Sequence, residues 1–277
     1  MSDQPDYSHI IKSLQEKYDS IDQDTDDHLL GLLYSKPITY WDYIKTDALL
    51  SLQTQRTTLP DEMVFIAYHQ INELIFKMIL WEISQVAEKE KLDVVFFESK
   101  IMRISRYFDM LTTSFNIMRE GMEVAQYMKF RYTLTPASGF QSAQYRFIEF
   151  ASTELINLID YRFRKDIDRK TPYTHAFEHL YWQAAGKNHQ TGEKTILIKL
   201  FEKKYMGEFI EFMEDYNDCN LSKKFKELPE DVQKNEELVK AMRHYDYTVN
   251  VKWVMAHYNA AGKYLGGGEK DLEATGG

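Results

Sequence analysis

The chain has 277 residues, of which 14% are aromatic, and its formal net charge is −9. An acidic chain without a basic block argues against nucleic acid or an anionic membrane as a partner. The one cysteine, Cys219, excludes an internal disulfide framework and suits a reducing cytoplasm, where we expect the protein. No apolar run is long enough to predict a membrane span, and the polar N-terminus does not resemble a signal peptide.

Residues 1–37 form a polar N-terminal arm, for which we predict a short helix over about residues 10–18 and a loose acidic stretch after it. Residues 38–277 follow as a single predicted domain. At its start, Tyr40, Tyr43 and Ile44 fall on one helical face. An aromatic face beside such an arm is typical of packing, either within the subunit or against a neighbouring copy.

Pro60 followed by Asp61 predicts the start of a long helix that continues to about residue 89. Its apolar residues recur at helical spacing, and a second face carries Phe65 and His69. His69 has two interpretations. It is either a core histidine bonded to a carbonyl oxygen, which is commoner for a lone histidine, or a hydrogen-bonding residue that lines a ligand cavity.

The stretch YMKFRYTLTPASGFQSAQYRFIEF, residues 127–150, has helical patterns at both ends and a break at Pro136. Gly139 can take backbone angles that a side chain forbids. Before the break, Tyr127 and Arg131 share one helical face, and a guanidinium matches the two oxygens of a carboxylate. This stretch is compatible with a carboxylate site, but on its own it favours a surface arginine beside a helical connection.

Long helices are also predicted over residues 92–118, 142–167 and about 235–265, and no strand alternation persists beyond a few residues. The expected fold is therefore all-α, a single large helical bundle. His175 and His179 have a spacing that could bind a metal ion, but no third ligand is evident nearby. Surface or packing histidines are the favoured interpretation of that pair.

His257 lies on the last predicted helix, with Trp253 one turn before it and Ala260 and Ala261 after it. Small residues beside a histidine leave room for a flat ligand, and a neutral imidazole commonly holds the iron of a haem. The alternative is a structural histidine, which is the commoner case for a lone histidine on a helix. The chain then ends in two glycine-rich runs, GGG and TGG, which are either a flexible end or a segment that folds over a site.

Taken together, these segments resemble the tryptophan 2,3-dioxygenase family. The most specific are PASGFQS, QYR and IEF in the central stretch and the F-x-x-x-H pattern of Phe65 and His69. TYWDYIKTDALLSLQ upstream and a late helical histidine followed by TGG match more loosely. The resemblance runs in the same order from about Ile38 to the C-terminus.

The resemblance implies an all-helical protein that binds one haem b per subunit, ferrous in the active form, and that forms a homotetramer built as a dimer of dimers. It implies insertion of both atoms of O2 across the indole C2–C3 bond of L-tryptophan, giving N-formylkynurenine in the first step of tryptophan catabolism. Haem supplies the oxygen chemistry in such enzymes, and the protein supplies orientation and exclusion of water.

Individual roles follow from the same resemblance. His257 resembles the ligand of the haem iron, and His69 resembles the catalytic histidine that hydrogen-bonds the substrate indole N–H. The other matched positions bind substrate or cofactor. They are Phe65 in the indole wall, Arg131 at the substrate carboxylate with Tyr127 beside it, Ser138 and Gly139 in the loop near the haem, Thr275 in the C-terminal loop, and Tyr40, Tyr43 and Ile44 in a segment that a neighbouring subunit inserts.

Some positions depart from the family pattern. Tyr68 precedes His69 where a glutamine is expected, and the tail after His257 is longer before its TGG than usual. Two other functions therefore stay open. One is a related haem monooxygenase or peroxygenase acting on another indole or aromatic amino acid, and the other is a haem-binding protein without catalysis.

Overall fold

The computed structural model describes residues 6–131, 134, 141–187 and 191–265 of the chain. Its described residues form helices and no strand, apart from two isolated bridges at Ile159–Leu180 and Lys187–Lys194. The predicted all-α class is thus confirmed. The chain divides into two compact units, residues 1–52 and residues 53–277.

The first unit is a succession of short helices: α1 (Ser8–Asp19), α2 (Thr25–Tyr34), α3 (Tyr40–Ile44) and α4 (Thr46–Leu50). The predicted helix near residues 10–18 is present as α1. The acidic stretch that we expected to be loose instead leads into α2, because the Asp24 carboxylate accepts a hydrogen bond from the Asp26 N–H and caps this helix. Lys45 takes a left-handed conformation and separates α3 from α4.

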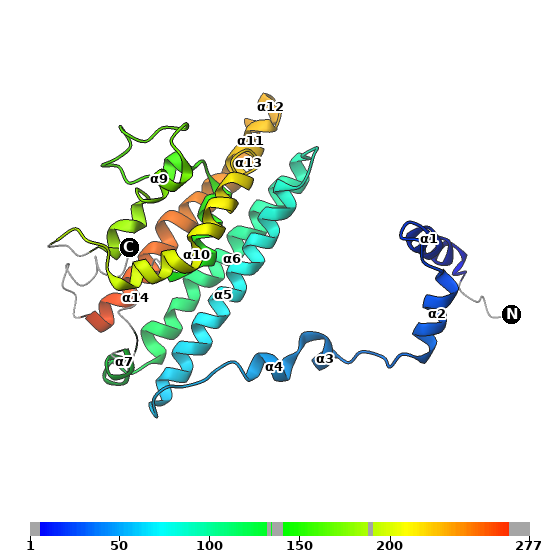
Figure 1. The fold of residues 1–277 in the computed structure, drawn as a ribbon, viewed down its shortest axis with the longest axis horizontal. Helices are drawn as coiled ribbons and strands as arrows, with labels where there is room; N and C mark the ends of the chain where they lie inside the picture. Colours follow the sequence, from blue (N-terminus) through cyan, green and yellow to red (C-terminus); the bar gives the residue numbers. More distant parts are fainter. Residues whose placement is uncertain (1–5, 132–133, 135–140, 188–190, 266–277) are drawn as a thin grey trace. The chain divides into compact units, whose positions relative to one another are not determined.

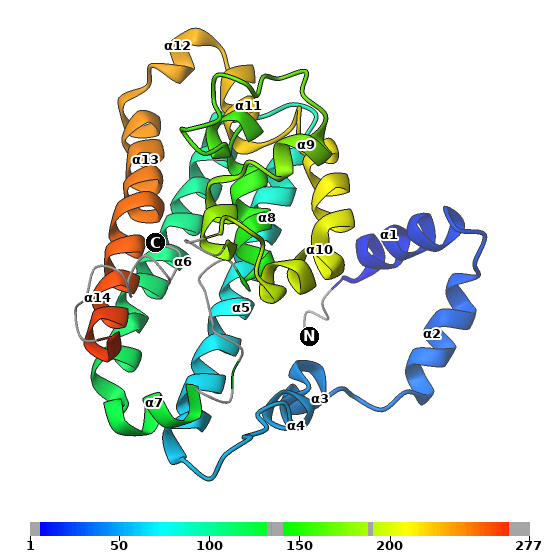
Figure 2. The same ribbon diagram turned by 60° about the vertical axis from the view of Figure 1, so that its left-hand side comes forward.

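The second unit is a bundle around two long neighbours, α5 (Pro60–Ala87) and α6 (Val94–Gly121), which lie side by side (Figure 1). After α7 (Val124–Arg131), the helix α8 (Ala143–Ser152) packs on α5, and α10 (Ile196–Asp215) packs on α8. The last helical segment packs on α6 and consists of α13 (Glu236–Tyr247), η4 (Thr248–Trp253) and α14 (Val254–Leu265) (Figure 2). The shorter elements are η2 (Leu155–Leu158), α9 (Tyr173–Phe177), η3 (Tyr181–Gly186), α11 (Leu221–Glu227) and α12 (Glu230–Gln233).

Two predicted helices differ from the observed ones. The helix expected over residues 142–167 ends at Ser152, whose hydroxyl bonds the Ile148 carbonyl and the Tyr245 phenol, and Thr153 is extended. The helix expected over residues 235–265 has the right extent, but a π-helical segment, η4, interrupts it. Neither interruption contains a proline, so tertiary packing sets both.

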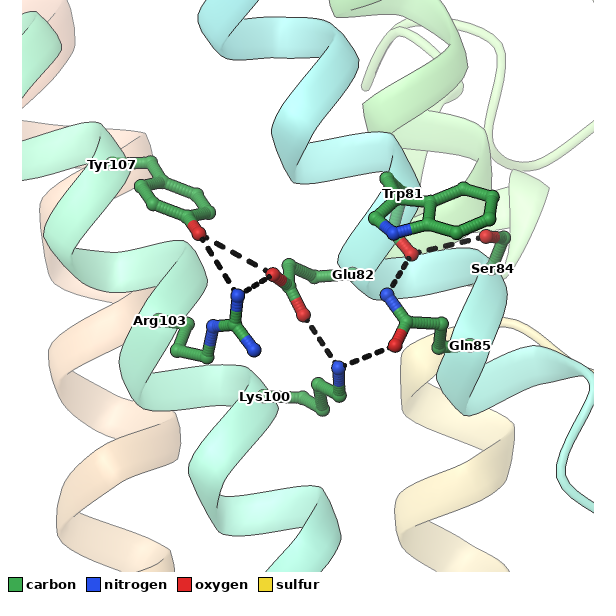
Figure 3. Close-up of polar contacts among 7 residues, drawn as sticks. All are labelled: Trp81, Glu82, Ser84, Gln85, Lys100, Arg103 and Tyr107. Atoms are coloured by element: carbon green, nitrogen blue, oxygen red, sulfur yellow. Dashed lines mark hydrogen bonds and ion pairs between the residues drawn. The ribbon is translucent and has the colours of Figure 1, made fainter. Parts of the chain in front are cut away.

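The α5–α6 contact contains a buried polar cluster (Figure 3). Glu82 on α5 accepts from Lys100 and pairs with Arg103, each at 2.7 Å, and Lys100 also donates to Gln85 at 2.6 Å. The side chains of Glu82 and Lys100 are only 3% and 7% exposed. Since a buried ion is costly without its partner, this cluster fixes the register of the two long helices.

Candidate functional site

The first turns of α5 bring Phe65 and His69 together, with ring centroids 4.0 Å apart. The Nδ1 atom of His69 lies 2.7 Å from the Phe65 carbonyl oxygen, which can only accept, so Nδ1 carries the proton and Nε2 is left as an acceptor. Nearby protein atoms exclude water from much of the surroundings of the His69 ring, although part of the ring is accessible to solvent. This loss of hydration disfavours the charged imidazolium and lowers the pKa of His69. His69 is therefore a neutral hydrogen-bond acceptor.

His257 lies on α14, where its ring is 5.6 Å from Phe115 and nearly parallel to Trp253 at 6.2 Å. Burial lowers the pKa of His257, and the charge that His69 can carry lowers it further. The second cause requires the two imidazoles to be near each other. Within the described part of the chain, no hydrogen bond engages the His257 ring, so its lone pair is available to a ligand.

The π-helical segment η4 sets the direction in which His257 points. An α-helix turns about 100° per residue, so on an unbroken helix His257 would point about 120° away from the buried Tyr245. A π-helical turn contains one residue more than an α-helical turn, so it cancels about 100° of that 120° difference in direction. Tyr245, Val249, Trp253 and His257, at successive four-residue spacings, thus share one face, and η4 brings His257 onto the inner side of the bundle.

Tyr127 and Arg131 come from α7 and border the same region. The Tyr127 ring lies 6.1 Å from Phe65 and 4.3 Å from Tyr264 of α14. Burial raises the pKa of the Tyr127 phenol and the charge of Arg131 opposes that rise, so the guanidinium is close to the phenol. Among the described residues, Arg131 forms no ion pair with a carboxylate, which suits a role toward an acidic ligand.

Tyr68 precedes His69, and the sequence analysis noted it only as a departure from the family pattern, without a role in the site. It is buried, its ring meets His69 edge-on at 5.3 Å, and it contacts Phe115 at 6.1 Å. Phe115 in turn contacts His257. Tyr68 and Phe115 thus form a continuous aromatic wall between the two histidines. One sequence pattern could have indicated that Tyr68 is buried. Tyr68 begins a series at helical spacing that continues with Asn72, Ile75 and Ile79, and all four are buried.

The QYR motif anchors the far end of the central stretch. The buried Arg146 guanidinium donates to Glu149 at 2.8 Å and to the Tyr181 hydroxyl at 3.0 Å, which ties α8 to η3. Gln144 donates to the Glu73 carbonyl oxygen at 2.8 Å and to its carboxylate at 2.9 Å, which ties α8 to α5. The motif therefore holds α8 against the helix that carries His69.

The other predicted residues lie outside the described residues, in the first unit, or at α9. Ser138, Gly139 and Thr275 lie outside the described residues. Tyr40, Tyr43 and Ile44 lie in the first unit, on or at the end of α3, and are largely exposed. The rings of His175 and His179 are 4.9 Å apart, and in the described part of the chain no group of three or more His, Cys, Asp or Glu residues could hold a metal ion.

The donor set fits a haem better than a bare metal ion. A bare ion needs several protein ligands, whereas haem iron needs one axial imidazole and a flat apolar slot. His257 offers that imidazole in neutral form, with Ala256 and Ala260 on its helix and aromatic rings beside it. In addition, the buried Trp253 Nε1 and Asn72 Oδ1 atoms have no hydrogen-bond partner among the described residues. A polar group from a bound cofactor would satisfy such an atom.

A separate groove of about 320 Å³ lies between α6, η4 and α14, with Met255, Val251 and Tyr247 among its lining residues. Met255 points about 160° round the helix from His257. The groove shares Phe115 and Ala256 with the candidate site but lies on the other side of α14 from His257, so it is a separate feature from the candidate site.

Comparison with known proteins assigns the chain to a family. The family model described as tryptophan 2,3-dioxygenase matches residues 31–274. The chain belongs to the tryptophan 2,3-dioxygenase family. Within that family, a tryptophan 2,3-dioxygenase of Ruegeria sp. (strain TM1040) is 37% identical over 118 residues, and one of Bacillus anthracis is 38% identical over 119 residues.

A third member of the tryptophan 2,3-dioxygenase family, tryptophan 2,3-dioxygenase 2 of Ralstonia nicotianae (strain ATCC BAA-1114 / GMI1000), is 38% identical over 125 residues. The matched stretch covers 42% of this chain for the Ruegeria relative, 43% for the Bacillus relative and 41% for the Ralstonia relative. It spans 42% of the length of the first two relatives and 34% of the third. The family is therefore established over most of the chain, and the closer pairwise similarity is confined to less than half of it.

Proposed function

We propose that the protein is a haem-dependent dioxygenase that cleaves the indole C2–C3 bond of L-tryptophan with O2 to give N-formylkynurenine. The observation that carries this proposal is the convergence of three helices. α5 supplies a neutral His69, α14 supplies an unengaged His257, and α7 supplies Tyr127 and Arg131. Family membership supports the same activity.

In this proposal His257 would hold the iron of haem b through its neutral imidazole, with the Trp253 and Phe115 rings beside it. When bound, the ferrous haem supplies the chemistry that activates O2. The lowered pKa of His257 keeps its nitrogen free of a proton that would compete with the metal. His257 would be the protein residue that holds the iron, and no second described residue is assigned to it in this proposal.

His69 orients the substrate. Because Nδ1 donates to the Phe65 carbonyl, the Nε2 atom can accept the indole N–H, and the Phe65 ring can pack on the indole. The charged guanidinium of Arg131 pairs with the substrate carboxylate, which would otherwise be desolvated without a partner. The protein thus contributes orientation and exclusion of water, and His69 keeps one hydrogen bond fixed through the reaction.

The remaining assignments rest on the family resemblance. We propose that Ser138 and Gly139 border the haem, that Thr275 contacts the substrate, and that the protein works in the cytoplasm as a homotetramer, a dimer of dimers. Tyr40, Tyr43 and Ile44 of one copy would then complete the pocket of a neighbour. Their large exposed areas within the first unit support an intermolecular role.

The test is the reaction of the haem-loaded, reduced protein with L-tryptophan under oxygen, followed by the mass of the product. A product with two added oxygen atoms is expected. One added oxygen atom would indicate a monooxygenase or peroxygenase instead. Haem uptake without tryptophan-dependent oxygen consumption would indicate a haem-binding protein without this activity.

A further inference from the structure

The helix α8 contacts the last helical segment at two points, one before η4 and one at its end. Near the start of α8, the Tyr145 ring stacks on Trp253, with ring centroids 4.6 Å apart and an interplanar angle of 25°. At the end of α8, the Ser152 hydroxyl hydrogen-bonds the Tyr245 phenol at 2.8 Å. Tyr245 lies in the last turn of α13, and Trp253 is the last residue of η4. We call these two pairs the α8 contacts, and they hold both ends of the π-helical segment.

The spacing of the α8 contacts differs by one residue between the two partners. Tyr145 and Ser152 are seven residues apart, which is close to two α-helical turns, so both lie on one face of α8. Tyr245 and Trp253 are eight residues apart, and on an unbroken α-helix they would point about 80° away from each other. Because a π-helical turn contains one residue more than an α-helical turn, η4 brings Tyr245 and Trp253 onto one face. The π-helical segment thus matches this part of the chain to the spacing on α8.

Contacts with other elements fix the position of α8. Gln144 donates hydrogen bonds to Glu73 of α5, and the buried Arg146 donates to the Tyr181 hydroxyl of η3. The Arg146 guanidinium also lies over the Tyr145 ring, 4.8 Å from its centroid. Both neighbours of Tyr145 in the QYR motif therefore anchor α8, so Tyr145 is a firm support for the ring that stacks on it.

Trp253 connects the α8 contacts with His257. Three phenylalanine rings of α5 and α6 meet the Trp253 ring at steep interplanar angles of 75°, 82° and 53°. Among the described residues, Tyr145 and His257 are the ring contacts of Trp253 that lie close to parallel with it, at 25° and 11°. Tyr145 thus supports the plane of the indole with which the His257 ring aligns.

We propose that Tyr145 and Ser152 are positioning residues, which hold η4 in its π-helical register and thereby set the direction of His257. The inference rests on the proposed function, in which His257 holds the haem iron. A π-helical turn is rare, so contacts with other elements have to maintain it. Without the α8 contacts, η4 should become α-helical and turn α14 by about 100°, which takes His257 away from the inner side of the bundle. The proposal also gives a role to the tyrosine of the QYR motif.

The test is a haem titration of variants in two backgrounds, the full chain and a chain that lacks Asn250. Tyr145→Leu and Ser152→Ala/Tyr245→Phe each remove one of the α8 contacts. In the full chain, each should weaken haem binding by about 10- to 100-fold, as loss of a group that orients a metal ligand typically does. Without Asn250, the last helical segment matches α8 as an α-helix, so the same substitutions should leave haem affinity unchanged. Equal losses in the two backgrounds would overturn the proposal, because they would show general damage to the core.

Two further variants serve as controls in the full chain. Tyr145→Phe keeps the stacked ring and should bind haem as the wild type does. Phe150→Leu removes a buried ring from another face of α8, where Phe150 packs on Phe209 of α10 at 5.6 Å, and should also leave haem affinity unchanged. A loss for Phe150→Leu as large as that for Tyr145→Leu would overturn the proposal. If Tyr145→Leu does not fold, Ser152→Ala/Tyr245→Phe, which removes only a hydrogen bond, still decides the outcome.

Thiol labelling of the haem-free protein measures the direction of α14 without the cofactor. In a Cys219→Ser background, Ala260→Cys occupies a position that is 5% exposed, and Met255→Cys, the reactive reference, occupies one that is 51% exposed. A maleimide should label Ala260→Cys quickly only when Tyr145→Leu is also present. Continued protection of Ala260→Cys in that folded variant would overturn the proposal. The expected labelling, in a chain whose wild type takes up no haem, would support the positioning role and contradict the proposed function instead.

Discussion

His69 and His257 lie near opposite ends of the sequence of the second unit, yet they are close enough in space that a positive charge on His69 would lower the pKa of His257. Both imidazoles are held neutral by desolvation, and Tyr68 and Phe115 connect them through ring contacts. One neutral imidazole is oriented by the Phe65 carbonyl, and the other has no hydrogen bond among the described residues. This asymmetry suits the roles proposed for them, which are orientation of the substrate for His69 and binding of the iron for His257.

The asymmetry predicts the effect of His69→Ala. This variant should bind haem with the spectrum of the wild type, because it leaves His257 in place, while its kcat/KM for tryptophan falls. Loss of one hydrogen bond that is kept through the reaction corresponds to about 10- to 100-fold. Steady-state kinetics and a haem titration check the two parts. Loss of haem from His69→Ala would mean that the roles of the two histidines are reversed.

Arg131→Ala should raise the KM for tryptophan, because the substrate carboxylate would then be desolvated without a cation. The expected change is on the order of 10- to 100-fold. Arg131→Lys should recover only part of it, since an ammonium lacks the fork that matches both oxygens. Tryptamine, which lacks the carboxylate, is the control substrate, and its weak turnover should be insensitive to Arg131. An unchanged KM would remove Arg131 from the site.

The lowered pKa values predict the pH dependence of stability. In the unfolded chain both histidines should titrate near their ordinary value of 6.5, and in the folded chain they titrate lower. Between those values the unfolded state binds more protons, so the free energy of unfolding should fall as the pH drops below about 6.5. Urea unfolding of the haem-free protein at several pH values measures this. His69→Gln/His257→Gln should show a weaker pH dependence, and an identical one would contradict the assignment.

Glu82→Leu should destabilise the protein by about 3–5 kcal/mol, because it leaves the Lys100 ammonium buried without its anion. Glu82→Leu/Lys100→Met removes both charges and should recover most of that loss. Urea denaturation with far-ultraviolet circular dichroism gives both values. Equal stability of the single and double variants would show that Lys100 reaches solvent when Glu82 is absent.

The π-helical segment predicts an unequal response to insertion and deletion. Deleting Asn250 lets η4 become α-helical while His257 keeps its direction, so haem binding should persist. Inserting one alanine after Asn250 requires a further π-turn or rotates His257 by about 100°, so haem binding should be lost. Haem titration of both variants checks this. Retention of normal haem binding by the insertion variant would contradict the role given to η4.

The sequence predicted the helical class and the start of α5 because helical spacing and the Pro60–Asp61 start are local signals. It did not predict η4, because one extra residue in a helical turn has no characteristic residue type or short motif in the sequence. The only trace is the run of four-residue steps from Tyr245 to His257. It also did not predict the end of α8 at Ser152, since the Ser152–Tyr245 contact depends on a helix far along the chain.

For the site, sequence patterns identified Phe65 with His69 and Tyr127 with Arg131, because each pair lies within one helix. Their convergence with His257 could not be read from spacing, since it depends on how α5, α7 and α14 pack. The burial of Tyr68 was missed for a related reason. A tyrosine in a helix can lie on the buried or on the exposed face, and the contacts of Tyr68 with Phe115 and Ser114 depend on where α6 packs.

The central claim is that His257 binds the iron of a haem in a pocket that His69 faces. Its most direct test is a haem titration of the wild type and His257→Ala, followed by the Soret absorbance in the ferric and reduced states. The wild type should take up one haem per chain with the spectrum of a histidine-ligated iron. His257→Ala should lose that spectrum while keeping its helical circular dichroism, and a normal Soret band in this variant would contradict the account.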